Sequence, residues 1–204
     1  MAAFQSDTDL LRAEIAAAAA RMIAEDGCDY QTAKRKAARQ ILGDRKSGSD
    51  ILPDNAQIED EIRIYNQLFF ADSQPARLLH LRKLALKLME ELAQFRPHLT
   101  GAILNGTAGE HSDIHLQLFS DSAKDVEIYL TNRNINVEIS ESTHFNNRNK
   151  SVETVSFMWQ NEGVHLALYE IDDMRGAFKS GSEKRSERAD TDTIRELISE
   201  EITP

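Results

Sequence analysis

The chain has 204 residues, of which 41% are hydrophobic and 28% are charged, values typical of a globular protein and not of a disordered one. No apolar run approaches the roughly 20 residues that a membrane-spanning helix needs. The N-terminus lacks the basic segment and long apolar core of a signal peptide, and a single cysteine, Cys28, rules out an internal disulfide. We therefore expect a cytoplasmic protein without a membrane partner.

The formal charge of −10 is unevenly distributed. Residues 1–50 contain eight Lys/Arg and eight Asp/Glu, so the whole excess lies in residues 51–204. Such an acidic body repels bulk nucleic acid, and any contact with RNA or DNA would have to be local. The basic run Lys34-Arg35-Lys36 with Arg39 could touch phosphate, but we interpret it first as a solvated helix face balanced by nearby acids.

Two helices joined by a short turn are predicted for the N-terminal part. The first begins at Asp7 to Asp9 and ends at Gly27, a natural C-cap, because apolar residues recur at steps of three and four. The second follows Asp29, and the polar stretch Gly43 to Leu52 is interpreted as a linker. This pattern predicts a helical hairpin, residues 1–50, and a separate domain, residues 51–204.

Two longer helices open the second part, and the pattern then changes from helical to alternating. Asp54 and Gln57 have capping-box spacing at the start of one helix, and the next runs from Pro75 to Pro97. Beyond Pro97 we expect five strands and a helix near 122–133, followed by a final helix near 193–200. The predicted strands are 101–105, 113–120, 137–140, 154–160 and 164–170. The fold class is therefore α+β, with a helical N-terminal half and a small mixed sheet flanked by helices.

The segment between the first two predicted strands contains the residues best suited to chemistry. Gly106-Thr107 follows an apolar strand, Gly109 lies in the turn, and Ser112-Asp113-Ile114-His115 opens the next strand. This arrangement resembles the nucleotidyltransferase (polymerase-beta-like) superfamily, in which Gly-Ser, a glycine-containing turn and Ser-Asp-x-Asp occupy these places. The resemblance covers roughly residues 75–175 and includes the order of helices and strands.

The resemblance implies a site that binds a nucleoside triphosphate and a divalent metal, Mg²⁺ or Mn²⁺, with Zn²⁺ less favoured. Gly106, Thr107, Gly109 and Ser112 would bind the nucleotide, and Asp113 and His115 would be catalytic. Acids spaced by one residue on a strand share a face, so both would reach the metals that stabilise charge at the attacked phosphorus.

The sequence departs from the family pattern at the metal ligands. His115 replaces the second acid, and imidazole is a poorer ligand for Mg²⁺ than for Zn²⁺, Mn²⁺ or Ni²⁺. A later strand offers His165 where a third acid is expected, with Glu138 on the preceding strand as an alternative. Asp113, His115 and His165 could form a transition-metal site, or the histidines could simply occupy the polar face of a sheet.

Two functions follow as hypotheses. The first is a nucleotidyltransferase that moves a nucleotidyl group to an unknown acceptor, which could be RNA, a protein or a small molecule. The alternative is a non-catalytic module that binds a nucleotide or a partner protein and lacks the metal carboxylates. The sequence does not determine the acceptor, the preferred base or the oligomeric state.

Overall fold

The structure is a computed structural model that describes residues 7–43, 51–145, 147, 149–176 and 188–202. The predicted α+β class is confirmed. The chain groups into two compact units, one comprising the chain up to Arg77 together with Gly106–His111, the other comprising Leu78–Asn105 and the chain from Ser112 onward. Within the described residues, no helix is both long and apolar enough to cross a membrane.

The first unit is built on three helices, α1 (Asp7–Asp26), α2 (Tyr30–Leu42) and α3 (Asn55–Phe69). Asp29 caps α2 through the Thr32 backbone N–H, and Asp54 with Gln57 forms the predicted capping box of α3. The buried residues between the helices are mostly alanines, whose small side chains allow close packing. They are Ile15, Ala16, Ala19, Ala20, Ala33, Ala37, Ala38, Ile58 and Ile62.

The boundary between the units differs from the one expected at residue 50. The helix α3 packs against α1 and belongs to the first unit, and the next helix, α4 (Gln74–Glu91), continues from the first unit into the second. The Gly106–His111 segment also groups with the first unit. The boundary therefore falls within α4, after Arg77, whereas residues 44–50 of the predicted linker lie outside the described residues.

The second unit is a six-stranded mixed sheet with the order β3-β4-β5-β2-β1-β6. Its only parallel pair is β2 with β5, in the centre, and the remaining neighbours are antiparallel. The strands are β1 (His98–Thr100), β2 (Ile114–Phe119), β3 (Glu138–Thr143), β4 (Ser151–Trp159), β5 (Glu162–Tyr169) and β6 (Arg188–Ala189).

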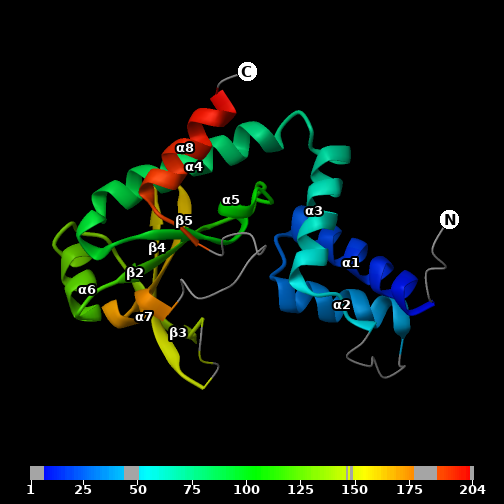
Figure 1. Cartoon of the computed structure of the whole chain (residues 1–204), viewed down its shortest axis with the longest axis horizontal. Coiled ribbons are helices and arrows are strands. Elements are labelled where there is room, and N and C mark those ends of the chain that lie inside the picture. Colours follow the sequence, from blue (N-terminus) through cyan, green and yellow to red (C-terminus); the bar gives the residue numbers. More distant parts are fainter. Residues whose placement is uncertain (1–6, 44–50, 146, 148, 177–187, 203–204) are drawn as a thin grey trace. The chain divides into compact units, whose positions relative to one another are not determined.

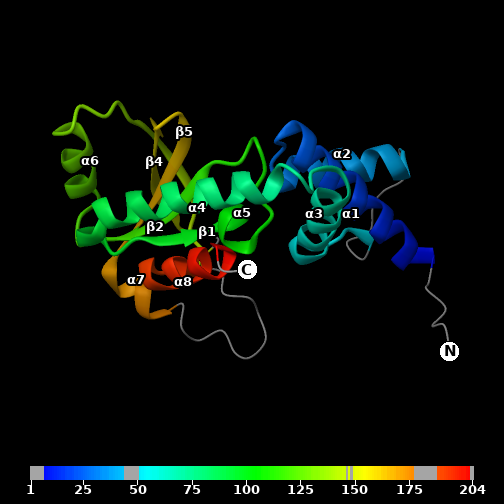
Figure 2. The ribbon, with the colours of Figure 1, turned by 90° about the horizontal axis from the view of Figure 1, so that it is seen from above.

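One face of this sheet is apolar and covered by helices. Figures 1 and 2 show α4 and α8 (Thr191–Ile202) running beside each other along the sheet, and α6 (Ala123–Thr131) adds buried Val126 and Leu130. The strands contribute every second residue to this core, as a two-residue period requires. These buried strand residues are Leu99, Ile114, Leu116, Leu118, Val155, Phe157, Val164, Leu166 and Leu168.

Two local predictions in this unit were wrong. Residues Gly101–Asn105 form the short helix α5 and not a strand, because the chain leaves the sheet at Gly101, whose φ of 72° is incompatible with an extended strand. The strand is instead His98–Thr100, which lies between the predicted end of the helix at Pro97 and the predicted strand at 101–105. A sixth strand, β6, lies in the polar stretch that was expected to be irregular.

Arg82 fixes α5 and α8 to α4. The Arg82 side chain is only 7% exposed, and it donates from Nε to the carbonyl of Ile103 (3.1 Å) and from Nη2 to that of Leu104 (3.3 Å). Its Nη1 pairs with Glu201 on α8. Burial lowers the pKa of Arg82, and Glu201 opposes that shift. Arg82 thus satisfies the carbonyls at the end of α5 that the short helix leaves without partners.

We predict that Arg82→Ala destabilises the sheet unit by about 3–5 kcal/mol, the cost of breaking a buried ion pair and leaving its partners unpaired. The measurement is urea unfolding followed by the fluorescence of Trp159, the only tryptophan, which lies on β4. Arg195→Ala is the control, because Arg195 joins the same two helices through Glu90 but both side chains are about half exposed. It should cost below about 1 kcal/mol, and equal losses for both variants would contradict the anchoring role of Arg82.

Candidate polar site on the open face of the sheet

The face of the sheet opposite α4 carries a row of polar side chains at matching register. His115 on β2 pairs with His165 on β5, and Ser156 on β4 lies opposite His165. On the other side, Thr100 on β1 pairs with His115, and Arg188 on β6 pairs with Thr100. Because paired residues project to the same face, five neighbouring strands each contribute one polar side chain to this row.

Asp113, His165 and Ser156 form a hydrogen-bonded chain. His165 Nε2 lies 3.1 Å from Asp113 Oδ2, and His165 Nδ1 lies 2.8 Å from Ser156 Oγ. A carboxylate oxygen only accepts hydrogen bonds, so Nε2 donates to it, and in the neutral imidazole Nδ1 is then an acceptor. Ser156 therefore donates its hydroxyl proton to His165, and the imidazole is held in one tautomer from both sides.

Gly163 makes room for the carboxylate of Asp113. A Cβ added at Gly163 would lie 2.6 Å from Asp113 Cγ, closer than atoms can approach without displacement. Gly163 is on β5, two residues before His165, and faces the same side of the sheet. The missing side chain therefore lets Asp113 reach across from β2 to His165.

His115 stacks on His165 and is held in its neutral form. The two ring centroids are 4.7 Å apart with an interplanar angle of 17°. Although His115 retains exposed surface, burial of its ring lowers the pKa of His115 to about 4, and the neighbouring His165 lowers it further while Asp113 opposes the shift. At neutral pH the His115 imidazole therefore offers one N–H donor and one acceptor nitrogen.

The donor set does not fit a bound Mg²⁺ ion. Mg²⁺ prefers several oxygen ligands in octahedral geometry, whereas Asp113 is the only carboxylate in this cluster and it already accepts a hydrogen bond from His165. Both nitrogens of His165 are also engaged. Across the described part of the chain, no three His, Cys, Asp or Glu side chains are placed to hold a metal ion. Glu138, the alternative third acid, lies opposite Ser156 on β3, and its residue is exposed.

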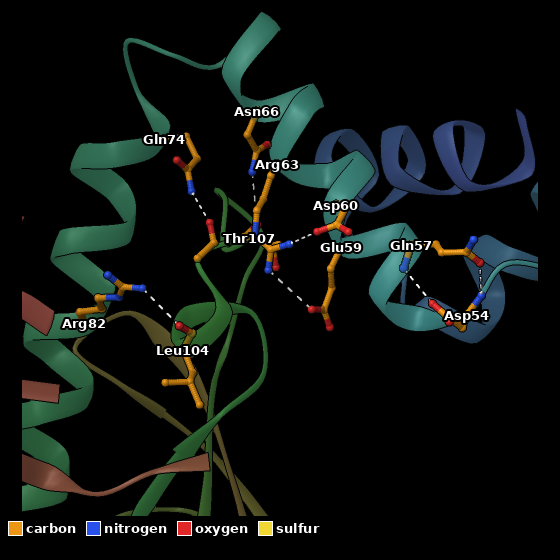
Figure 3. Close-up of polar contacts among 11 residues, drawn as sticks. Asp54, Gln57, Glu59, Asp60, Arg63, Asn66, Gln74, Arg82, Leu104 and Thr107 are labelled. Carbon is orange, nitrogen blue, oxygen red and sulfur yellow. Dashed lines mark hydrogen bonds and ion pairs between the residues drawn. The ribbon is translucent and has the colours of Figure 1, made fainter. Parts of the chain in front are cut away.

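The Gly106-Thr107 turn is anchored within the first unit (Figure 3). Asn66 Nδ2 donates to the carbonyl of Thr107 (3.3 Å), and Gln74 Nε2 donates to the carbonyls of Gly106 (3.2 Å) and Ala108 (2.8 Å). Thr107 itself is 5% exposed. The hydroxyl predicted to meet phosphate is therefore buried, and the carbonyl oxygens of the turn face amide donors from α3 and α4.

The remaining turn residues divide between the two units. Gly109 belongs with Gly106 and Thr107 in the first unit, whereas Ser112 belongs with Asp113 in the second. His111 packs against Gly27 of the first unit, where an added Cβ would come within 2.7 Å of the His111 Cβ. The structure thus brings together Asp113, His115 and His165 but assigns the predicted phosphate-binding glycines to the other unit.

Two residues beside the row were not predicted from the sequence. Gly101 follows Thr100, the partner of His115, and a Cβ added there would meet no atom within 4 Å, so its backbone borders open space. Ser156 was interpreted only as part of a strand. The alternation of Ser156 with the buried residues Val155 and Phe157 could have indicated that its side chain lies on the open face. Only the strand register shows that Ser156 lies opposite His165.

The far half of this face is covered by aromatic side chains. Phe119, Val152 and Tyr169 are buried there, with Phe145 and Met174 packed against them. Arg188 lies over the rings of Phe119 and Phe145, with its guanidinium carbon 4.9 and 5.6 Å from the centroids, and donates to the carbonyl of Met174 (2.8 Å). The polar end of the face is therefore bordered by a packed, apolar floor that fixes Arg188 in place.

The pKa of His115 should respond in opposite directions to its two neighbours. Asp113→Asn removes the charge that raises this pKa and should lower it below about 4, whereas His165→Gln should raise it. NMR titration of the imidazole C–H signals measures both values. A wild-type value near 6.5 would contradict the crowded environment of the ring.

The lowered pKa of His115 also makes the free energy of unfolding depend on pH. The folded pKa of about 4 lies below the ordinary 6.5, so the unfolded chain binds this proton first as the pH falls. His115 therefore contributes a loss of stability between pH 6.5 and pH 4, which His115→Gln should remove.

Comparison of the chain with protein-family models, with curated proteins and with solved structures finds no match.

Proposed function

We propose that the chain is a nucleotide-binding module of nucleotidyltransferase-like architecture in which the His115–His165 cluster of the open sheet face has Asp113 as its single carboxylate. The observation that carries this proposal is the polar row across β4, β5, β2, β1 and β6. Imidazole and hydroxyl groups of this row are donors that phosphate oxygens accept from.

The central strand pair supports a ligand at this end of the face. Asp113 and His115 stand at the start of β2, beside His165 on the parallel strand β5, and Gly101 leaves the neighbouring strand β1 next to them. The open space at Gly101 would let a phosphate approach the backbone without meeting a side chain. In this proposal Gly101 takes the phosphate-binding role that the family resemblance implies for Gly106.

Metal-dependent nucleotidyl transfer is supported less well. A catalytic Mg²⁺ ion would need at least two carboxylate ligands from this cluster. The cluster has one, Asp113, which already accepts a hydrogen bond from His165, and the other nitrogen of His165 is bonded to Ser156. A ligand bound through hydrogen bonds from the imidazole and hydroxyl groups of the row needs no such pair. We therefore favour binding without a tightly held metal, and an acceptor such as RNA or a protein remains part of the catalytic alternative only.

ATP, GTP, CTP and UTP should each be tested for binding to the full chain by isothermal titration calorimetry, with Mg²⁺ and with EDTA. We expect binding of at least one triphosphate, with affinities in the two buffers that agree within about twofold. His115→Gln should weaken binding about tenfold or more, since it removes an imidazole hydrogen bond to a charged ligand. His80→Gln is the control, because His80 lies on α4 and pairs with Glu162.

His115→Asp provides the second half of this test. It places a carboxylate two residues from Asp113 on the same face, so Mg²⁺ should then strengthen triphosphate binding about tenfold in the variant. The proposal fails if no triphosphate binds at millimolar concentration, or if wild-type binding is lost in EDTA.

Ser156 supports a second candidate function on the same face. Its hydroxyl donates to His165 Nδ1 while Asp113 accepts from Nε2, so His165 is positioned as a general base for Ser156. Attack of Ser156 Oγ on the α-phosphorus of a nucleoside triphosphate would form an O–P bond and release pyrophosphate. The hydroxyl proton would pass to His165, and the product would be a nucleotidylated serine.

A fluorophosphonate probe tests this second function without a nucleotide. Attack by Ser156 would form the O–P bond and break the P–F bond, releasing fluoride, and peptide mapping would locate the label. His165→Gln should slow labelling by about 10²–10⁴-fold, the usual contribution of a general base. Gly163→Ala should also slow it, because the new methyl group displaces Asp113 from His165.

Two outcomes decide the nucleophile hypothesis. Ser142→Ala should label like the wild type, because Ser142 bonds to Thr154 and not to a histidine. Absence of label at Ser156, or a label of equal rate in His165→Gln, would rule the hypothesis out while leaving nucleotide binding untouched.

A further inference from the structure

The helix α2 carries a cluster of basic residues in a chain that is acidic overall. Its sequence contains Lys34, Arg35, Lys36 and Arg39 and no acidic residue, whereas the whole chain carries a formal charge of −10. The chain therefore concentrates positive charge on one helix of the first unit. Clustered positive charge of this kind is typical of protein surfaces that bind polyanions such as nucleic acids.

A groove runs along this helix. It has a volume of about 410 Å³, and its walls include Lys34, Arg35 and Arg39. It is also lined by the apolar residues Ala38, Leu42 and Leu52, the last from the segment that precedes α3. A lining that is partly cationic and partly apolar suits a ligand that has both negative charge and flat apolar surface.

Among the described residues, no carboxylate forms an ion pair with the charged side chains that line the groove. Within the part of the chain that the structure describes, Arg35 and Arg39 form no ion pair, and Lys34 Nζ donates to the neutral amide oxygen of Asn55 (3.3 Å). Elsewhere in the same unit, arginines do pair, as Arg63 does with Glu59 and Asp60. The solvated-face interpretation of this run assumed balancing acids, and none is found among the described residues.

We propose that this groove binds the backbone of a short single-stranded nucleic acid. Arg35 and Arg39 are four residues apart and so lie about 6 Å apart along the helix axis, on one face. They can therefore contact successive phosphates while the apolar lining at Ala38 and Leu42 receives a base. The acidic remainder of the chain disfavours a long duplex, which would extend over it, so a flexible strand following the groove is the better fit.

This nucleic-acid site is independent of the nucleotide site on the sheet. It lies wholly within the first unit, in α2 and the segment before α3. The absence of an aromatic side chain among the groove residues named above predicts weak dependence on base sequence, since stacking platforms are what single-strand binders add to phosphate contacts. Phosphate contacts then set the affinity, which makes it strongly dependent on salt.

The test is fluorescence anisotropy of labelled oligouridylate and oligothymidylate, each about a dozen nucleotides long, with the full chain at several salt concentrations. Each phosphate contact contributes a slope of about −0.7 to log K against log salt for single strands. With two or three contacts we expect a slope of about −1.4 to −2.1. Arg35→Ala and Arg39→Ala should each reduce its magnitude by about 0.7, and the double variant should lose most of the binding.

Lys36→Ala is the matched control. It removes the same charge from the same helix, but Lys36 does not line the groove and its Nζ lies 3.9 Å from Cys28 Sγ. It should leave both affinity and slope within experimental error. Binding of the oligouridylate alone would identify the ligand as RNA, and binding of the oligothymidylate alone would identify it as DNA. Either result supports the proposal.

Three results would overturn the nucleic-acid site. These are no binding at about 50 mM salt, an equal loss in Lys36→Ala and Arg39→Ala, and competition by polyglutamate as effective as by unlabelled strand. Circular dichroism confirms that each variant is folded. Triphosphate binding measured on the Arg35 and Arg39 variants should equal the wild type, so the nucleic-acid site and the nucleotide site can fail separately.

Discussion

The parallel pairing of β2 with β5 is the constraint on which the second unit depends. A parallel pair needs a long crossover connection, and here the chain passes through α6, β3 and β4 before β5 returns beside β2. The register then aligns His115 with His165. Since both strands are central, a shift of one residue would turn Leu116 and Leu166 out of the core, so burial of one face holds the chemistry of the other in place.

Hydrogen bonds between neighbouring strands order the side chains of the open face. Asp113, His165 and Ser156 come from three neighbouring strands and satisfy one another in sequence. Gly163 supplies the space that this arrangement needs. With its protons accounted for, the cluster favours direct recognition of an anionic ligand, and it places a hydroxyl beside a base in the manner of activated nucleophiles.

The two units divide the possible ligands by charge and shape. The sheet unit offers a few fixed donors around neutral His115, which suits a small phosphorylated ligand. In the helical unit, Arg35 and Arg39 line a groove on α2 and form no ion pair among the described residues, and the proposed ligand there is a chain of phosphates. In each unit the recognition groups lie on a well-buried scaffold, the alanine-rich helix packing in one and the leucine-rich sheet face in the other.

Hydrophobic periodicity, together with capping, glycine and proline residues, determined the fold class, the helices α1 to α4 and the strands β2, β4 and β5. The reason is that side-chain burial repeats every 3.6 residues in a helix and every two in a strand. The same alternation correctly placed Asp113, His115 and His165 on one face. It could not place Gly101–Asn105, where a five-residue apolar run suits a strand or a buried turn of helix equally well. There the positive φ of Gly101 and the carbonyl bonds from Arg82 decided for a helix.

Tertiary structure alone decided which residues meet. Gly106 and Thr107 are near Asp113 in sequence, yet Asn66 and Gln74 hold them in the first unit, while Ser156, 43 residues away from Asp113 by numbering, joins it through His165. The physical reason is that local sequence sets the face on which a side chain lies, whereas strand order and register set its neighbours across the sheet.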